Sequence, residues 1–232
     1  MGEMITIKGQ DGDFAAYVAR PGKPKAPAVV VIQEIFGVNQ VMRDTCDELA
    51  AAGYLAVCPD LFWRIEPGID ITDQSEAEFK KAFELYNAFD VETGAKDITT
   101  TIDQVRGMAE VNGKVGAVGF CLGGLLAFLT AARTDSDATV SYYGVGIEKH
   151  LAEAEKQSHP LLMHIAEEDA FVPKEAQALI LATLKNHPQI SIYTYPGRDH
   201  AFSRKGGEHY DEADAKLAGG RSLAFFQQHL ES

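Results

Sequence analysis

The sequence predicts an α/β fold with a mainly parallel central sheet, helices on both faces and an N-terminal antiparallel hairpin. Three observations predict it. Apolar runs of strand length alternate with helix-length stretches along most of the chain. Some of these runs, such as residues 28–32, are continuously apolar, which is typical of strands buried on both faces of a parallel sheet. Near the N-terminus, two alternating runs flank Asp11-Gly12-Asp13, which indicates a hairpin.

The first half of the chain is expected to begin with the hairpin and continue as a strand–helix alternation. Residues 21–27, rich in Pro and Lys, connect the hairpin to the next strand at the surface. Gly53 closes the first helix, and residues 61–72 are expected to be irregular. The expected strands are 4–8, 14–19, 28–32 and 54–58, and the expected helices are 39–52, 73–89 and 92–109.

The second half continues the alternation to the C-terminus. A helix is expected to start at Pro173, because proline fits the first helical turn. The expected strands are 115–118, 138–143, 160–166 and 190–195, and the expected helices run from the turn after 118 to Arg133, over 174–186 and over 211–229, with a short helix or turn at 146–154. The chain has no repeat or linker, so we expect one domain, residues 1–232.

Composition and charge exclude several classes of function. With 46% hydrophobic and 24% charged residues, the chain resembles an ordinary globular protein. No stretch approaches the roughly 18 consecutive apolar residues of a membrane helix. The net charge of −13 argues against nucleic acid and anionic membranes as partners. An anionic substrate would therefore need a local basic cluster to receive it. Nothing indicates an interface between copies, so a monomer is expected.

The cysteines and the N-terminus bear on location. Cys46, Cys58 and Cys121 lie far apart, without metal-ligand spacing, and no His/Asp cluster has ligand spacing either. We therefore expect no metal and no cofactor. Residues 1–6 contain neither a basic region nor an apolar core, so no signal peptide is predicted. These features predict a cytoplasmic protein with reduced thiols.

The chain is organised around Gly-Phe-Cys-Leu-Gly at 119–123, which follows the apolar run 115–118 and precedes a helical stretch. This strand–turn–helix context is that of a nucleophile elbow, with Cys121 where serine is usual. The flanking glycines accommodate the sharp turn where a β-carbon would clash. The helix N-terminus favours a thiolate at Cys121. Taken alone, the motif is equally compatible with a buried cysteine in a glycine-rich turn.

Reactive groups follow the predicted strands at Glu34, Cys121, Asp169 and His200. In such a sheet, ligands bind outside the carboxyl ends of the strands, so these groups are expected to gather at one edge. Nucleophile, acid and histidine occur in the chain order of the α/β-hydrolase fold. This coincidence favours a Cys-His-Asp triad more strongly than the elbow alone.

Of the seven histidines, only His200 follows both the acid and the last strand, in a loop with Gly197. His164 lies inside a predicted strand and is expected to be a packed core residue. For the others, near element ends or on predicted surface helices, solvation is the simpler expectation; they are His150, His159, His187, His209 and His229.

Four residues are candidates for the acid of the triad. Asp169 is favoured because it precedes residues 170–173, where the loop turns into the next helix. Glu167 and Glu168 are neighbouring alternatives. Asp199 is the weaker candidate, because neighbouring side chains on an extended segment point apart.

These residues predict a mechanism. His200, oriented by Asp169, takes the thiol proton and Cys121 attacks an acyl carbon. The N–H groups of Leu122 and Ile35 hold the oxyanion, and water then hydrolyses the thioester with His200 as base. Sulfur leaves more readily than an amine, so amides are poor substrates. Esters with an enol or other stabilised leaving group suit this chemistry better.

Four segments together resemble the dienelactone hydrolase family (carboxymethylenebutenolidases), whose members use cysteine on the α/β-hydrolase fold. The resemblance extends over nearly the whole chain. The segments are QEIFGVN at 33–39, GFCLGG at 119–124, YYGVG at 142–146 and HAFSR at 200–204.

The resemblance implies hydrolysis of a carboxylate-bearing unsaturated lactone to maleylacetate in chloroaromatic breakdown, through Cys121, His200 and Asp169. It also implies that Glu34 contacts the resting thiol and takes part in its activation. A carboxylate beside a thiol disfavours the thiolate, so Glu34 could instead restrain it. The simpler alternative is a carboxylate near the N-terminus of the following helix.

The resemblance also implies a set of substrate-binding residues. Arg204 matches a family arginine that holds the substrate carboxylate. A second family arginine falls at Phe79, with Lys80 and Lys81 adjacent; a solvated helix face is the alternative for both lysines. The remaining positions implied by the resemblance are Phe83, Tyr86 and Tyr143.

Three other functions compete with this interpretation. An esterase or thioesterase could use the same triad on another acyl substrate. A redox or ligand sensor would use the Cys121 thiol without Asp169 or His200. A metal hydrolase lacks the ligand spacing it needs.

Overall fold

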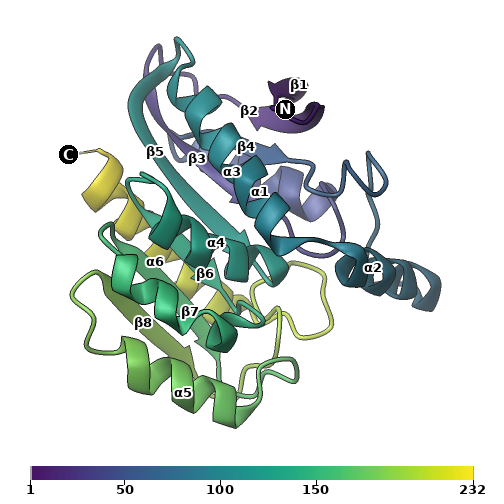
Figure 1. Ribbon diagram of the computed structural model, residues 1–232, viewed down its shortest axis with the longest axis vertical. Helices are drawn as coiled ribbons and strands as arrows, with labels where there is room; N and C mark the ends of the chain where they lie inside the picture. Colours follow the sequence, from purple (N-terminus) through teal and green to yellow (C-terminus); the bar gives the residue numbers. More distant parts are fainter. Residues whose placement is uncertain (1, 232) are drawn as a thin grey trace. The chain divides into compact units, whose positions relative to one another are not determined.

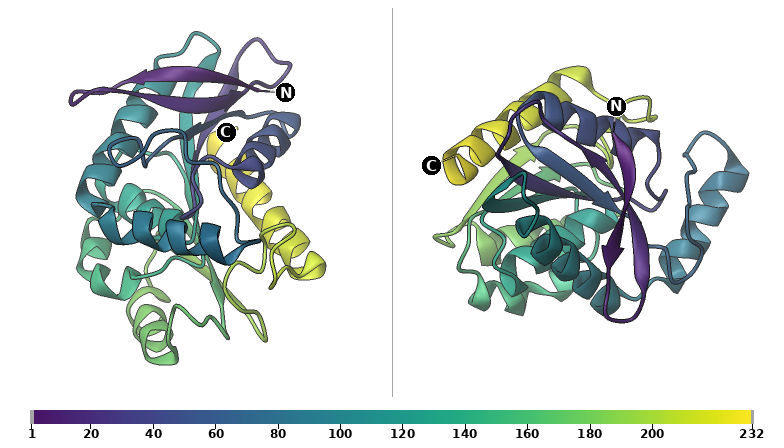
Figure 2. Two further views of the ribbon diagram at one scale, coloured as in Figure 1. Left: turned by 90° about the vertical axis from the view of Figure 1, so that its right-hand side faces the viewer. Right: turned by 90° about the horizontal axis from the view of Figure 1, so that it is seen from above.

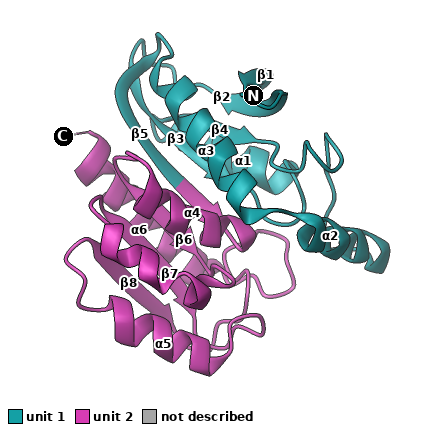
Figure 3. Ribbon diagram, in the orientation of Figure 1, with its two compact units in different colours: residues 1–117 teal, residues 118–232 magenta. Residues whose placement is uncertain are grey.

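The computed structural model describes residues 2–231 (Figure 1). The chain divides into two units, residues 1–117 and 118–232, with the boundary inside strand β5 (Val111–Phe120) (Figure 3). None of the helices in the described part of the chain is both long and apolar enough to cross a membrane. The expectation of one domain stays a prediction.

In the first unit, the strands follow the order β1-β2-β4-β3-β5. β1 and β2 form the predicted antiparallel hairpin, β2 also pairs antiparallel with β4, and β3 pairs parallel with β4. Helices α1 and α3 lie on opposite faces of these strands (Figure 2), and β3 is accordingly buried at every residue. The elements are β1 (Glu3–Lys8), β2 (Asp13–Ala19), β3 (Ala26–Ile32), α1 (Gln40–Ala51), β4 (Leu55–Pro59), α2 (Glu76–Ala88) and α3 (Val91–Arg106).

In the second unit, the end of β5 is followed in the sheet by β6, β7 and β8. The pairs β6·β7 and β7·β8 are parallel, so the carboxyl ends of these strands lie at one edge. Helices α4 and α5 cover one face and α6 the other (Figures 1 and 2). The elements are α4 (Leu122–Arg133), β6 (Thr139–Tyr142), 3-10 helices η1 (Ile147–Lys149) and η2 (Leu151–Lys156), β7 (Leu161–Ala166), α5 (Lys174–Leu184), β8 (Ile190–Tyr195) and α6 (Glu212–Leu230).

The boundaries differ most from the sequence prediction at β5. The apolar run predicted 115–118, whereas the strand begins at Val111 and includes the polar residues Asn112 and Lys114. A strand is defined by backbone pairing, which continues past the last apolar side chain. Helix α3 ends earlier than predicted, at Arg106, because Gly107 caps it.

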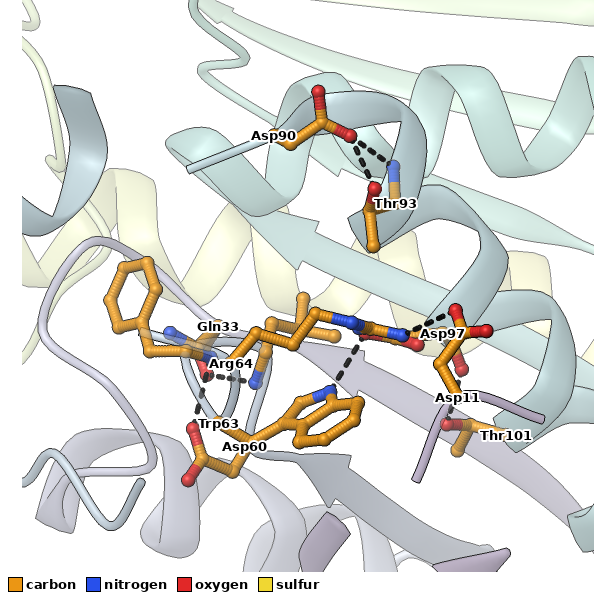
Figure 4. A network of polar contacts seen from close by, with 11 residues as sticks. Asp11, Gln33, Asp60, Trp63, Arg64, Asp90, Thr93, Asp97 and Thr101 are labelled. Carbon is orange, nitrogen blue, oxygen red and sulfur yellow. Dashed lines mark hydrogen bonds and ion pairs between the residues drawn. The ribbon is translucent and has the colours of Figure 1, made fainter. Parts of the chain in front are cut away.

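A buried carboxylate ties the segment after β4 to α3 in the first unit (Figure 4). Asp97 is 4% exposed. It accepts a hydrogen bond from Trp63 Nε1 at 2.9 Å and forms an ion pair with Arg64. The Arg64 guanidinium also lies over the Trp63 ring, 4.1 Å from its centroid, and donates to Asp11. A buried charge is stable when it is paired and hydrogen-bonded in this way.

A second buried polar network joins β6, β7, β8 and α6. His164, inside β7 and 1% exposed, contacts Tyr195 Oη through Nδ1 at 2.7 Å and Ser222 Oγ through Nε2 at 3.0 Å. Ser222 Oγ also lies 2.7 Å from Tyr142 Oη, and Arg221 donates to Tyr195 Oη. The prediction that His164 is a packed core residue is confirmed.

Candidate active site

Cys121 stands between the end of β5 and the start of α4, with φ 58° and ψ −115°. This positive φ is rare for a residue with a β-carbon, and such strain is found at functional sites. The turn leaves no room for a side chain beside it. A β-carbon on Gly119 would lie 1.9 Å from the Gly123 carbonyl oxygen, and one on Gly124 would lie 2.4 Å from the Tyr142 carbonyl oxygen. Gly119 and Gly124 are therefore required by the elbow.

The tight turn leaves Cys121 partly exposed. Leu122 follows it as the first residue of α4. The first N–H groups of a helix have no partner within the helix and carry its positive dipole end. The backbone around Cys121 is thus suited to an anion.

His200 and Asp169 form a buried pair on neighbouring loops of the second unit, after β8 and β7. His200 Nδ1 lies 2.9 Å from Asp169 Oδ2 and 3.1 Å from Oδ1, and both residues are 6% exposed. Asp169 Oδ1 also accepts the Phe171 N–H at 2.8 Å. Because Nδ1 is committed to Asp169, Nε2 is left for a second partner.

The Cys121 side chain also forms a hydrogen bond with His200. Burial acts to lower the pKa of His200. The charge interaction with Cys121 and the bonds to Asp169 and Cys121 outweigh burial and raise the pKa to about 10. Cys121, His200 and Asp169, which the sequence predicted as a triad, therefore lie in one connected chain of contacts.

The other acidic candidates have different partners. Glu168 is exposed and pairs with Lys174 at 2.9 Å. Asp199 Oδ1 accepts two backbone N–H groups, from Ala170 at 2.9 Å and from His200 at 2.6 Å. Asp199 therefore joins the two loops that hold the acid and the histidine, and its adjacency to His200 was the only sign of this in the sequence.

Two aromatic rings hold the His200 imidazole edge-on. Phe171 has its ring centroid 4.9 Å from that of His200, at 76°, and Tyr143 has its centroid 5.1 Å away, at 64°. Tyr143 itself is 2% exposed, with Oη 2.9 Å from Ser203 Oγ. No pattern in the sequence marks Phe171, because its contact with His200 joins two loops far apart in the chain.

The remaining predicted residues lie as follows. Arg204 is half-buried on the His200 loop, where its backbone N–H donates to the Ala201 carbonyl at 2.9 Å. In the first unit, Glu34 and Ile35 follow β3 and are 2% and 7% exposed. On α2, Lys80 is exposed, whereas Phe83 and Tyr86 are half-buried.

Helix α2 presents aromatic rings near the predicted position of the second family arginine. The Phe79 ring is 6.2 Å from Phe36 and 5.1 Å from Phe83, and Phe79 is 37% exposed. Lys81 forms an ion pair with Glu66. Of the two neighbouring lysines, Lys80 is exposed and Lys81 is half-buried.

Comparison with known proteins identifies the family. The model of the dienelactone hydrolase family matches residues 14–230. The chain belongs to this family. A relative from Azospirillum brasilense that bears the carboxymethylenebutenolidase name is 54% identical, with 96% of each chain covered. The carboxymethylenebutenolidase of Pseudomonas putida is 43% identical, over 96% of this chain and 95% of the other.

Dienelactone hydrolases also resemble the chain in structure. A crystal structure named for a dienelactone hydrolase of Klebsiella pneumoniae has a TM-score of 0.86 and 29% identity, covering 99% of both chains. The predicted α/β-hydrolase fold is confirmed, and the chain is a carboxylic ester hydrolase of the carboxymethylenebutenolidase type.

Proposed function

We propose that this protein hydrolyses a carboxylate-bearing unsaturated lactone, dienelactone, to maleylacetate, as expected in chloroaromatic degradation, with Cys121, His200 and Asp169 as the catalytic triad. The observation that supports it best is the connected chain from the elbow cysteine through His200 to both Asp169 oxygens. The family membership and the carboxymethylenebutenolidase relatives support the substrate class.

The first half-reaction opens the lactone ring. The Cys121 sulfur, having given its proton to His200, attacks the lactone carbonyl carbon, and the carbonyl π electrons move to oxygen. The N–H of Leu122, and that of Ile35 as the family resemblance implies, stabilise this oxyanion. The ring C–O bond then breaks, which leaves a thioester on Cys121 and an enolate that takes the proton from His200.

The second half-reaction releases the acid. A water molecule attacks the thioester with His200 as base, the C–S bond breaks, and the thiol is restored. The enol product tautomerises to the ketone. The pKa of His200, raised to about 10, matches a group that holds a proton beside sulfur until the leaving group needs it.

The residues proposed to bind the substrate carry either a positive charge, opposite to that of its carboxylate, or an aromatic ring. Arg204, on the His200 loop, is the candidate for the substrate carboxylate. Lys80, Phe83, Tyr86 and Tyr143 keep the binding roles that the resemblance implies, and Glu34 keeps its part in activating the thiol. A monomer in the cytoplasm remains our proposal for the state of the enzyme, and light scattering tests the monomer.

Ultraviolet-monitored hydrolysis of cis- and trans-dienelactone by the wild type and by Cys121→Ala tests the proposal. We expect rapid loss of the lactone absorbance with the wild type and none with the variant. Cleavage of simple aryl esters through Cys121, without lactone turnover, would rule out the lactone as substrate but remain consistent with the proposed triad. In the same assay, Glu34→Gln with unchanged kcat and KM would remove Glu34 from the mechanism.

A further inference from the structure

Gln33 has no part in the mechanism so far, yet it opens the motif that contains Glu34 and Ile35. It lies immediately after β3 and is fully buried, at 0% exposed. A buried side-chain amide is costly unless its oxygen and nitrogen both find partners. The partners that Gln33 finds therefore show what it holds in place.

Both ends of the Gln33 amide contact backbone, and Figure 4 shows the Gln33 side chain beside Asp60. The Leu61 N–H donates to Gln33 Oε1 at 3.0 Å, and Gln33 Nε2 donates to the Glu34 carbonyl oxygen at 3.2 Å. The Leu61 donor fixes the orientation of the amide, because an N–H needs the oxygen rather than the NH₂ group opposite it. The NH₂ group must then face Glu34.

The Glu34 carbonyl belongs to the same peptide group as the Ile35 N–H. In a trans peptide the C=O and N–H bonds point in opposite directions, so holding one fixes the direction of the other. A hydrogen bond to the carbonyl also polarises the peptide and makes its N–H a stronger donor. Gln33 thus controls both the direction and the strength of the Ile35 N–H.

The segment around Leu61, which contacts Gln33, is itself fixed by hydrogen bonds. Asp60, 2% exposed, precedes Leu61 and accepts the N–H groups of Phe62 at 3.0 Å and Gly68 at 2.7 Å. On the other side of Ile35, the Phe36 carbonyl accepts the Ile71 N–H at 3.2 Å. The segment after β4 therefore braces the Glu34–Ile35 peptide through Gln33 and on its far side.

We propose that Gln33 is a positioning residue that presents the Ile35 N–H to the oxyanion of the tetrahedral intermediate. The inference rests on the proposed function, which makes Ile35 an oxyanion donor. Gln33 touches neither substrate nor reacting atoms in this role. It acts through the peptide that it holds. Its loss therefore reduces the stabilisation of the transition state and leaves substrate binding intact.

Two substitutions and a control separate this role from plain stability. Gln33→Met removes both hydrogen bonds at similar volume. Gln33→Glu keeps an acceptor for Leu61 but removes the donor to Glu34. Thr101→Val, the control, removes a buried bond of 2.8 Å to the Asp97 carbonyl in α3 of the same unit. We expect kcat to fall about 10- to 100-fold in both Gln33 variants, with KM within about threefold and kcat unchanged in the control, since loss of an oxyanion donor acts on kcat.

Inhibition by 2,2,2-trifluoroacetophenone gives a second readout. Its carbonyl carbon bonds to the Cys121 sulfur and its oxygen becomes an oxyanion, so its Ki should rise with the loss of kcat/KM in the Gln33 variants. In the wild type, this adduct should move the Ile35 amide proton downfield, a measurement that does not depend on the variants folding. An Ile35 proton unmoved by the adduct, or folded Gln33 variants with wild-type kcat and Ki, would overturn the inference. A wild type without Cys121-dependent turnover would instead reject the proposed function.

Discussion

At the scale of single residues, the environment of His200 reverses the usual effect of burial on an imidazole. Buried imidazoles normally lose their proton, because burial disfavours the charged form. Here the interactions with Cys121 and Asp169 reverse that tendency and raise the pKa of His200 to about 10. The native state thus holds a proton on His200 that an unfolded chain releases near its ordinary pKa of 6.5.

This shift predicts the pH dependence of activity and stability. Because the folded pKa is raised, the stabilisation by protonated His200 is fully present below pH 6.5 and is lost as the pH rises through about 10. We expect kcat/KM to hold from neutral pH until it falls towards pH 10, as the imidazolium loses its proton. Steady-state rates and thermal unfolding from pH 6 to 10.5, beside His200→Gln, check this; a fall in activity centred near pH 6.5 would contradict it.

Asp169 and Asp199 lie close to the same histidine but are predicted to act differently. Asp169→Asn should lower kcat by about 10²–10⁴, because the imidazole of the proposed triad then loses its carboxylate. Asp199 accepts backbone N–H groups through one oxygen, Oδ1, which an asparagine can reproduce. Asp199→Asn should therefore stay near wild type, whereas Asp199→Ala should lose about 1–3 kcal/mol of stability. Equal loss of kcat in both asparagine variants would contradict these roles.

At the scale of elements, the network around His164 joins α6 to three strands of the second unit. Burial, with a smaller contribution from the Arg221 charge, lowers the pKa of His164 to about 3. A depressed histidine pKa means that the unfolded chain binds the proton more readily, so this group reduces stability as the pH falls from 6.5 towards 3. His164 thus opposes acid stability, whereas a histidine whose pKa is the same in the folded and unfolded chain would leave stability unchanged.

Ser222→Ala tests the network. It removes the Ser222 hydroxyl that contacts both His164 Nε2 and Tyr142 Oη, so we expect a loss of about 1–3 kcal/mol in the free energy of unfolding. Thr183→Ala is the matched control, because the Thr183 hydroxyl bonds the Leu179 carbonyl on the exposed side of α5. Denaturant unfolding should show little change there. Equal losses in both variants would mean that the network adds nothing beyond a surface hydroxyl.

The secondary-structure elements could be predicted from the sequence more completely than the contacts that support the site. Periodicity located the strands and the elbow, because burial and glycine spacing are local properties of the chain. The start of β5 at Val111 was missed, since Asn112 and Lys114 pair through backbone that no apolar pattern marks. Gln33, Asp199 and Phe171 were missed as supports because each acts through a contact that only the fold creates.

At the scale of the whole molecule, the net charge of −13 opposes the approach of an anionic substrate. Added salt screens such repulsion, over a distance of about 10 Å at 0.1 M ionic strength. A close contact with a half-buried arginine such as Arg204 is screened much less. Long-range repulsion should therefore weaken with salt before the local attraction does.

We predict that kcat/KM for the carboxylate-bearing lactone rises about two- to fivefold between low salt and about 0.2 M NaCl, because screening removes the repulsion. A neutral aryl ester of similar size is the control and should show no such rise. Arg204→Gln should raise KM for the lactone but not for the neutral ester. In this variant, kcat/KM for the lactone should still rise with salt. If kcat/KM for the lactone falls with salt, local attraction governs the encounter, and the overall charge has no part in selecting the substrate.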